Sequence, residues 1–140
     1  ETSIGLDRMF LSVLSNSFRN EDLGEGKTRA VLSLPPALAP YKVAIMPLTK
    51  KEGHPEKARE IMNELKFDFN CTYDEKDSPG KRYRRQDAIG TPFCVMVDHQ
   101  TMEDNTVTIR DRDTMDQDRV AISELSQIID KKVSLKNLLK

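Results

Sequence analysis

The sequence of 140 residues contains no tryptophan, two cysteines and two histidines, and aromatic residues make up only 6% of it. No apolar run approaches the roughly 20 residues that a membrane-spanning helix requires. No basic start followed by an apolar stretch indicates a signal peptide either. We therefore expect a cytoplasmic protein without a membrane partner.

The cysteines and histidines are too few and too scattered to predict a metal site or a disulfide framework. Cys71 and Cys94 each lie inside an apolar, strand-like run without a CxxC pattern, so we expect buried, reduced thiols. His54 and His99 stand in turn-like surroundings, where we expect solvated loop residues. The sequence predicts no metal ligand.

Neither sign of charge dominates, because 22 basic and 23 acidic residues leave a net charge of −1. A polycation that binds nucleic acid through its overall charge is thus excluded. Hydrophobic residues at 37% and charged residues at 32% are typical of a folded domain with a charged surface. Locally, five basic and two acidic residues between positions 76 and 87 give a charge of +3.

The first 40 residues divide into three parts. Apolar residues recur at spacings of three and four between Leu6 and Phe18, which predicts an amphipathic helix. A polar, glycine-containing connection at 19–27 precedes a short strand-like run at 30–34. The prolines between 35 and 40 exclude a helix there, and we expect a domain boundary at this point.

The remaining residues alternate between strand and helix patterns. Strands are predicted at 42–46, 69–73, 91–97, 105–112 and 119–122, with helices at 54–65, 78–90 and 123–132. Ser78 and Ser123 are the expected N-caps of the last two helices. We expect a hairpin connection at 113–118, and a helix capped by Thr114 and Gln117 is the alternative. This order predicts an α/β fold, a mixed five-stranded sheet flanked by helices.

Two charged segments stand out. The helix at 78–90 carries basic residues on more than one face, which fits either a solvated surface or an RNA contact through guanidinium groups. On the strand at 105–112, Arg110 and Arg112 share a face that we expect to be half exposed, and Asp111 and Asp113 point the other way. Internal ion pairs would explain this pattern, and so would the reading of RNA base edges.

Longer strings resemble a known family. PALAP at 36–40, KVAIMPL at 42–48, GKRYRRQDAIGTPF at 80–93 and TVTIRDRDTM at 106–115 resemble the anticodon-binding domain of homodimeric class II glycyl-tRNA synthetases. The resemblance covers nearly everything from residue 1 to about 131. It implies an anticodon-binding domain at 35–140 and, at 1–34, the end of a class II catalytic core. Because the sequence opens on Glu1, we expect a piece of a longer chain.

Residues 1–8, ETSIGLDR, resemble motif 3 of the same family, with Thr2 where proline is more usual. The resemblance implies that Glu1 pairs with the glycine ammonium, that Ser3 and Gly5 shape the amino-acid pocket and that Arg8 holds ATP phosphate. The implied glycine-binding residues are Glu1, Thr2, Ser3, Ile4 and Gly5. The implied ATP-binding residues are Gly5, Leu6, Asp7 and Arg8.

The implied function is glycine activation with ATP and transfer to its tRNA by a homodimeric parent, in which this piece recognises the anticodon stem-loop. The expected tRNA-binding residues are Lys81, Arg82, Arg85, Arg110, Asp111, Arg112 and Asp113. ATP with Mg²⁺ would serve the parent. We expect the piece alone to bind no cofactor and to be inactive, since class II motifs 1 and 2 are absent. A non-catalytic nucleic-acid-binding accessory protein is the alternative, although motif 3 argues against it.

Overall fold

The centre of the computed structural model, which describes residues 3–137 and 139, is a five-stranded mixed sheet in the order β4-β3-β5-β6-β7. Its strands are β3 (Val43–Pro47), β4 (Cys71–Tyr73), β5 (Phe93–Val97), β6 (Thr106–Asp111) and β7 (Gln117–Ala121). Strand β3 pairs in parallel with β4 and β5, whereas β6 is antiparallel to β5 and β7. The predicted fold class is confirmed, including the late hairpin, so a helix starting at Thr114 is wrong.

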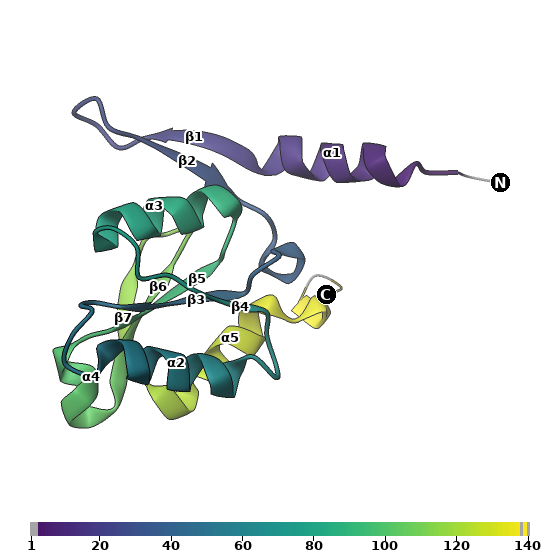
Figure 1. Cartoon of the computed structure of the whole chain (residues 1–140). Coiled ribbons are helices and arrows are strands. Elements are labelled where there is room, and N and C mark those ends of the chain that lie inside the picture. The colour runs from purple at the N-terminus through teal and green to yellow at the C-terminus, as the bar shows by residue number, and fades with distance from the viewer. Residues whose placement is uncertain (1–2, 138, 140) are drawn as a thin grey trace.

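Helices cover both faces of this sheet. Figure 1 shows α2 (His54–Leu65) and α5 (Leu125–Val133) on one face and α3 (Pro79–Ile89) on the other. Every residue of β3 and β5 is buried, and alternate side chains reach opposite layers. Val43 and Ile45 join the core against α2 and α5, whereas Ala44 and Met46 lie in the smaller core that includes Tyr83 of α3.

The helix ends differ in part from the prediction. Helix α3 begins with Pro79 and closes on Gly90 in the left-handed conformation (φ 84°), as expected. However, the Ser78 side chain makes no capping hydrogen bond. Ser123 lies inside a 3₁₀ turn at Ile122–Glu124, and α5 starts only at Leu125. Ser78 therefore holds the predicted N-cap position without the side-chain bond, whereas the predicted Ser123 cap is wrong.

A hairpin precedes the sheet. Helix α1 (Leu6–Ser17) runs directly into β1 (Phe18–Asp22), which pairs antiparallel with β2 (Thr28–Leu32). Residues 19–22 of the predicted polar connection form β1 instead, because β2 supplies the hydrogen bonds that these polar residues need, and only 23–27 form the turn. The hairpin lies beside α3 (Figure 1). A Cβ on Gly90 would meet the Leu32 carbonyl oxygen at 3.0 Å, so the contact is close.

A short helix, α4 (His99–Asp104), follows β5 and was not predicted. Asp98 and Thr101 form its capping box: the Thr101 amide donates to Asp98 Oδ1 (3.1 Å), and Thr101 Oγ1 accepts from the Asp98 amide (3.0 Å). The Asp98-x-x-Thr101 spacing is the one feature of the sequence that could have predicted the start of this helix.

Prolines shape the segment before β3. Pro36–Leu38 form a 3₁₀ turn, and the α-helix excluded by the sequence is not seen at 35–40. Lys42 Nζ donates to the carbonyl oxygens of Pro36, Ala37 and Ala39 (3.2, 2.8 and 2.8 Å), which holds the turn against the first strand of the sheet. A domain boundary here stays a prediction. Among the described residues, no helix is long and apolar enough to cross a membrane.

The predictions for the cysteines and histidines have different outcomes. Both cysteines are free thiols, and Cys94 is buried as predicted, whereas Cys71 is only half-buried. Burial raises the pKa of Cys71 to about 11 and that of Cys94 to about 12, which keeps both protonated at neutral pH. His54, in contrast, is fully buried at the start of α2. The expectation of a solvated His54 is therefore wrong.

Candidate nucleic-acid interface

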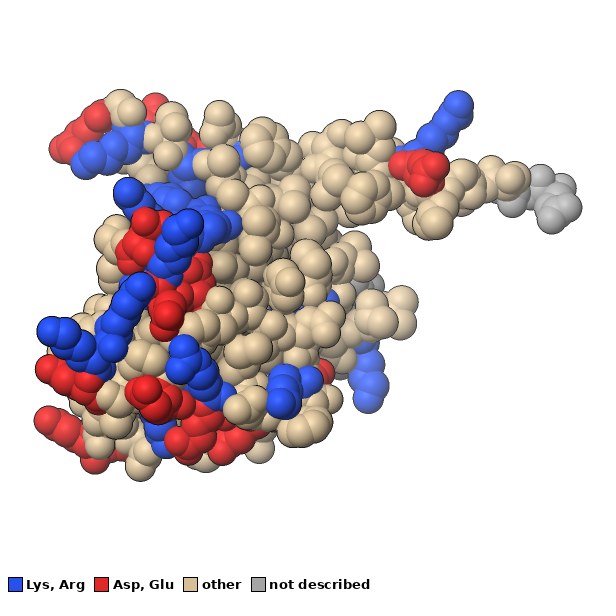
Figure 2. All heavy atoms as spheres, viewed as in Figure 1, with Lys and Arg blue, Asp and Glu red and all other residues tan. Residues whose placement is uncertain are grey.

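Helix α3 presents part of its basic residues to solvent. Lys76, Lys81 and Arg84 are exposed, and no hydrogen bond or ion pair of the Lys81 ammonium is found within 3–137 and 139. In Figure 2, basic and acidic side chains are interspersed along the edge of the molecule near α3, whereas α1 is largely uncharged. The accessible positive charge is thus local and sits between acidic neighbours.

Arg85 is the most heavily paired of these basic residues. Its Nε and Nη2 donate to the two carboxylate oxygens of Asp74 at 2.9 and 3.0 Å, and Nη1 donates to Asp77 at 3.2 Å. Burial by itself would raise the pKa of Asp74, but the hydrogen bonds from Arg85 and the Lys76 amide leave it below its usual value. The Asp74 hydrogen bonds in turn raise the pKa of Arg85. Much of the Arg85 charge is therefore neutralised within the protein.

The local charge is smaller when the acidic residues just before Lys76 are included. Residues 74–87 contain five basic and four acidic side chains, which leaves +1 instead of the +3 of residues 76–87. Arg82 does not contribute to the surface, since it is 3% exposed and donates from Nε to the Asp77 carbonyl and from Nη1 to the Pro47 carbonyl. Lys76, Lys81 and Arg84 remain as the accessible cations of this segment.

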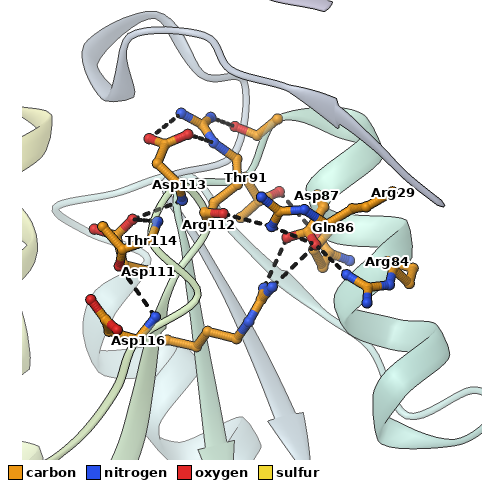
Figure 3. A network of polar contacts seen from close by, with 12 residues as sticks. Arg29, Arg84, Gln86, Asp87, Thr91, Asp111, Arg112, Asp113, Thr114 and Asp116 are labelled. Carbon is orange, nitrogen blue, oxygen red and sulfur yellow. Dashed lines mark hydrogen bonds and ion pairs between the residues drawn. The ribbon is translucent and has the colours of Figure 1, made fainter. Parts of the chain in front are cut away.

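On the inner side of α3, several guanidinium groups surround a buried carboxylate. Asp87 is fully buried, and Arg110 donates to it from Nη1 at 2.9 Å and from Nη2 at 3.2 Å. Arg29 of the hairpin lies 3.3 Å from the same carboxylate, and Arg84 lies 3.6 Å from it. Figure 3 shows Arg29 and Arg84 directed at Asp87 from different elements. The network thus joins β2, α3 and β6.

The network continues into the turn after β6. Arg112 is 2% exposed, and its donors reach the carbonyl oxygens of Gly90 (2.8 Å) and Leu34 (2.7 Å) as well as both carboxylate oxygens of Asp113 (2.9 and 2.8 Å). The Arg112 carbonyl in turn accepts from Arg29 Nη1 at 2.8 Å. These bonds fix the hairpin, the end of α3 and the turn in one arrangement.

The expectation that Arg110 and Arg112 stand on a half-exposed face is wrong. Arg110 is 4% exposed, and its guanidinium lies 4.8 Å from the centre of the Tyr83 ring. The reason is that α3 and the hairpin cover this face of β6. Of the two readings of the alternating charges, internal ion pairs account for both arginines. A direct contact with RNA stays a prediction that the burial does not support.

The turn at 111–116 presents the acidic members of the segment. Asp111 accepts from the Asp113 amide (2.8 Å) and pairs with Lys132 of α5 at 2.6 Å. Burial by itself would raise the pKa of Asp111, yet the Lys132 hydrogen bond holds it below its usual value. The side chain of Asp113 is 47% exposed, so its carboxylate is accessible although Arg112 fixes it. Figure 3 shows Asp113, Thr114 and Asp116 grouped in this turn.

The segment assigned to glycine and ATP is only partly described. Glu1 and Thr2 lie outside the described residues. Residues 3–8 are all exposed and lead into the first turn of α1, with Arg8 on that turn. The glycine and ATP roles stay predictions.

Sequence reasoning did not identify Arg29, Glu21 and Asp74 as partners in this region. Arg29 Nε donates to Glu21 Oε2 at 2.9 Å across the hairpin, and its 3.3 Å pair with Asp87 spans 58 positions of sequence. No local pattern signals a contact at that separation. The register of β1 and β2 places Glu21 opposite Arg29, but the hairpin that sets this register was not predicted.

Known proteins share both the sequence and the fold. Residues 42–132 match a family described as the anticodon binding domain. The glycine–tRNA ligases of Clostridium tetani and Geobacillus thermodenitrificans are 53% and 51% identical over 95% and 96% of this chain. In both cases the match spans 28% of the relative's length.

A solved structure also shares the fold of this chain. A prolyl-tRNA synthetase from Cryptosporidium parvum, solved with halofuginone and AMPPNP, superposes on 74% of this chain with a TM-score of 0.68 and 28% identity. The match covers 23% of that protein. Sequence and structure therefore lead to the same family.

Proposed function

Because this chain belongs to the anticodon binding domain family, which residues 42–132 match, we propose that it recognises the anticodon stem-loop of a glycine tRNA. The high identity to glycine–tRNA ligases over nearly the whole chain carries the choice of glycine. The chain corresponds to little more than a quarter of those relatives. Ligation of glycine to tRNA is thus proposed for a longer parent, with this piece supplying recognition.

The proposed contact surface is the outer side of α3 together with the turn at 111–116. Lys81 is exposed and bears an ammonium without a protein partner among the described residues, which suits a phosphate oxygen. Arg85 retains a side chain that is 39% exposed beside it. The carboxylate of Asp113, 47% exposed, can accept a hydrogen bond from a base edge.

The remaining predicted residues act from beneath this surface. The guanidinium groups of Arg82, Arg110 and Arg112 are buried and bonded to protein, so they hold α3 and the turn in place. Asp111 has the same role through Lys132. Preorganisation of this kind lowers the conformational entropy that binding would otherwise cost.

In the parent, glycine and ATP with Mg²⁺ would be the further substrates. Arg8 is exposed on the first turn of α1, and a guanidinium suits a phosphate. ATP supplies the phosphoanhydride that activates the amino acid, and the Arg8 charge would bind and orient it. We further propose a cytoplasmic, homodimeric parent.

Binding of a labelled glycine-tRNA anticodon stem-loop, followed by fluorescence anisotropy at several salt concentrations, tests this proposal. The logarithm of the association constant should fall with the logarithm of salt by about 0.7 for each phosphate that the protein neutralises. A stem-loop with a scrambled loop of equal length is the control. An affinity that is independent of salt, or equal for the scrambled loop, would contradict the proposal.

A further inference from the structure

Three potential metal ligands converge at one end of the sheet. Glu52 and His54 follow β3, and His99 follows β5. The two strands are adjacent and parallel, so their carboxyl ends meet at the same edge. Strand β4 lies on one side of β3 and β5 lies on the other, so the chain leaves β3 in opposite directions to form its two neighbours. The crevice at such a switch point is where α/β sheets commonly bind ligands.

The buried imidazole of His54 has one nitrogen without a partner. His54 is fully buried, and its Nε2 is the one buried side-chain nitrogen or oxygen without a hydrogen bond among the described residues. Burying a polar atom without a partner destabilises the folded state. An unpaired nitrogen of this kind can be satisfied by a bound ion or a water molecule.

The hydrogen bonds around Thr49 determine which His54 nitrogen carries the proton. The Thr49 hydroxyl donates to the Lys51 carbonyl at 3.2 Å, so its oxygen is left to accept. His54 Nδ1 lies 3.2 Å from that oxygen and donates to it in the tautomer that carries its proton on Nδ1. In a neutral imidazole, Nε2 then carries the lone pair. A histidine whose other N–H is fixed by an oxygen is the usual arrangement of a metal ligand.

The other two donors lie close to this nitrogen. His54 Nε2 lies 3.9 Å from Glu52 Oε2, which lies 2.9 Å from His99 Nδ1. The histidine rings stand edge to face with centroids 4.7 Å apart, and the three donor atoms all lie within 4.8 Å of one another. Tetrahedral zinc, with ligand distances of about 2.0–2.2 Å, separates its donor atoms by roughly 3.4 Å. The two measured separations from Glu52 bracket that value.

We propose that Glu52, His54 and His99 form a binding site for a divalent transition-metal cation of the zinc class. Two imidazoles and one carboxylate suit such a cation, whereas Mg²⁺ and Ca²⁺ prefer oxygen ligands throughout. An ion pair alone explains the His99–Glu52 contact but leaves His54 Nε2 unsatisfied. The bound cation would link the loop after β3 to the start of α4, and water would complete its coordination.

The site can form with small movements. The side chains of Glu52 and His99 are 59% and 62% exposed, so both are free to adjust around a cation, whereas His54 is fixed. Among the described residues this is the one group of three or more His, Cys, Asp or Glu side chains arranged to hold a metal ion. This inference is independent of the proposed RNA recognition.

Titration of the metal-free 140-residue chain with Co²⁺ tests the site, because tetrahedral Co²⁺ with nitrogen ligands gives visible absorption bands. We expect one equivalent to bind, Zn²⁺ to displace it and Zn²⁺ to raise the melting temperature. The variants Glu52→Gln and His99→Asn, both at exposed positions that should not disturb folding, should weaken binding at least tenfold. Glu56→Gln, an exposed acid in the first turn of α2, is the matched control and should bind as the wild type does.

Two results would overturn the proposal. One is the absence of Co²⁺ absorption and of any Zn²⁺-dependent change in melting temperature in the wild-type chain. The other is binding that Glu52→Gln and His99→Asn leave unchanged, which would assign the metal to another group such as the half-buried thiol of Cys71. Circular dichroism of each variant shows whether a loss of binding reflects a loss of fold.

Discussion

The guanidinium of Arg110 meets the carboxylate of Asp87 through two hydrogen bonds of 2.9 and 3.2 Å, with both side chains buried between α3 and the sheet. Asp87 also faces Arg29 and Arg84. One carboxylate therefore faces guanidinium groups from two other elements, β2 and β6, and from the preceding turn of its own helix.

Asp87→Asn should destabilise the protein by about 3–5 kcal/mol. The substitution keeps the side-chain shape but leaves the buried guanidinium groups of Arg29 and Arg110 without their counter-charge. Urea unfolding gives the change in free energy. Asp118→Asn, an exposed aspartate on β7, is the control and should change stability by less than about 0.5 kcal/mol. Equal effects of the two substitutions would show that the buried network does not hold the fold together.

Because of the Asp74–Arg85 pair, we expect the free energy of unfolding to fall in acid. Because the folded pKa of Asp74 lies below its usual 3.8, its stabilising contribution is present above that value and is lost as the pH falls through the lowered folded pKa. Asp74→Asn should therefore be less stable than the wild type at pH 7, and the difference should shrink below about pH 4. Urea unfolding at a series of pH values measures both quantities. A difference that stays constant down to pH 2 would contradict the prediction.

The periodic elements could be predicted from the sequence, but the partners of the charged side chains could not. Strands β3 and β5 are continuous apolar runs, and their position in the centre of the sheet follows from that alone. Arg110, in contrast, continues an alternating pattern that is typical of a half-exposed strand. Its burial depends on Asp87, 23 positions earlier, and on the hairpin that carries Arg29. Contacts of this range are set by tertiary packing.

Lys81→Ala should weaken the binding of all stem-loops to a similar degree and lower the salt slope by about 0.7, the contribution of one phosphate. The exposed Lys66, which follows α2 on the opposite side of the sheet, is the matched control, and Lys66→Ala should leave both quantities unchanged. Anisotropy titrations at several salt concentrations provide the comparison. If both lysines matter equally, the α3 surface is not the RNA-binding face.

Deletion of residues 1–16 should leave the melting temperature nearly unchanged. Helix α1 exposes Leu6, Phe10 and Leu11 by 79, 65 and 63%, so little of its apolar surface stabilises the fold. The helix lines an open groove of about 570 Å³ with Leu32, Leu34, Leu38 and Pro40, among others. Binding of a hydrophobic dye should fall on deletion. A large loss of stability would show that α1 packs more tightly than the structure indicates.

The central claim is that this chain recognises a glycine anticodon. The most direct test compares its dissociation constants for two stem-loops that share the same stem and loop length and differ only in the three anticodon bases. Losing the correct base-edge contacts should cost about 1–3 kcal/mol, so the replaced anticodon should bind roughly 5- to 150-fold more weakly at the same salt concentration. Equal dissociation constants for the two stem-loops would contradict the account.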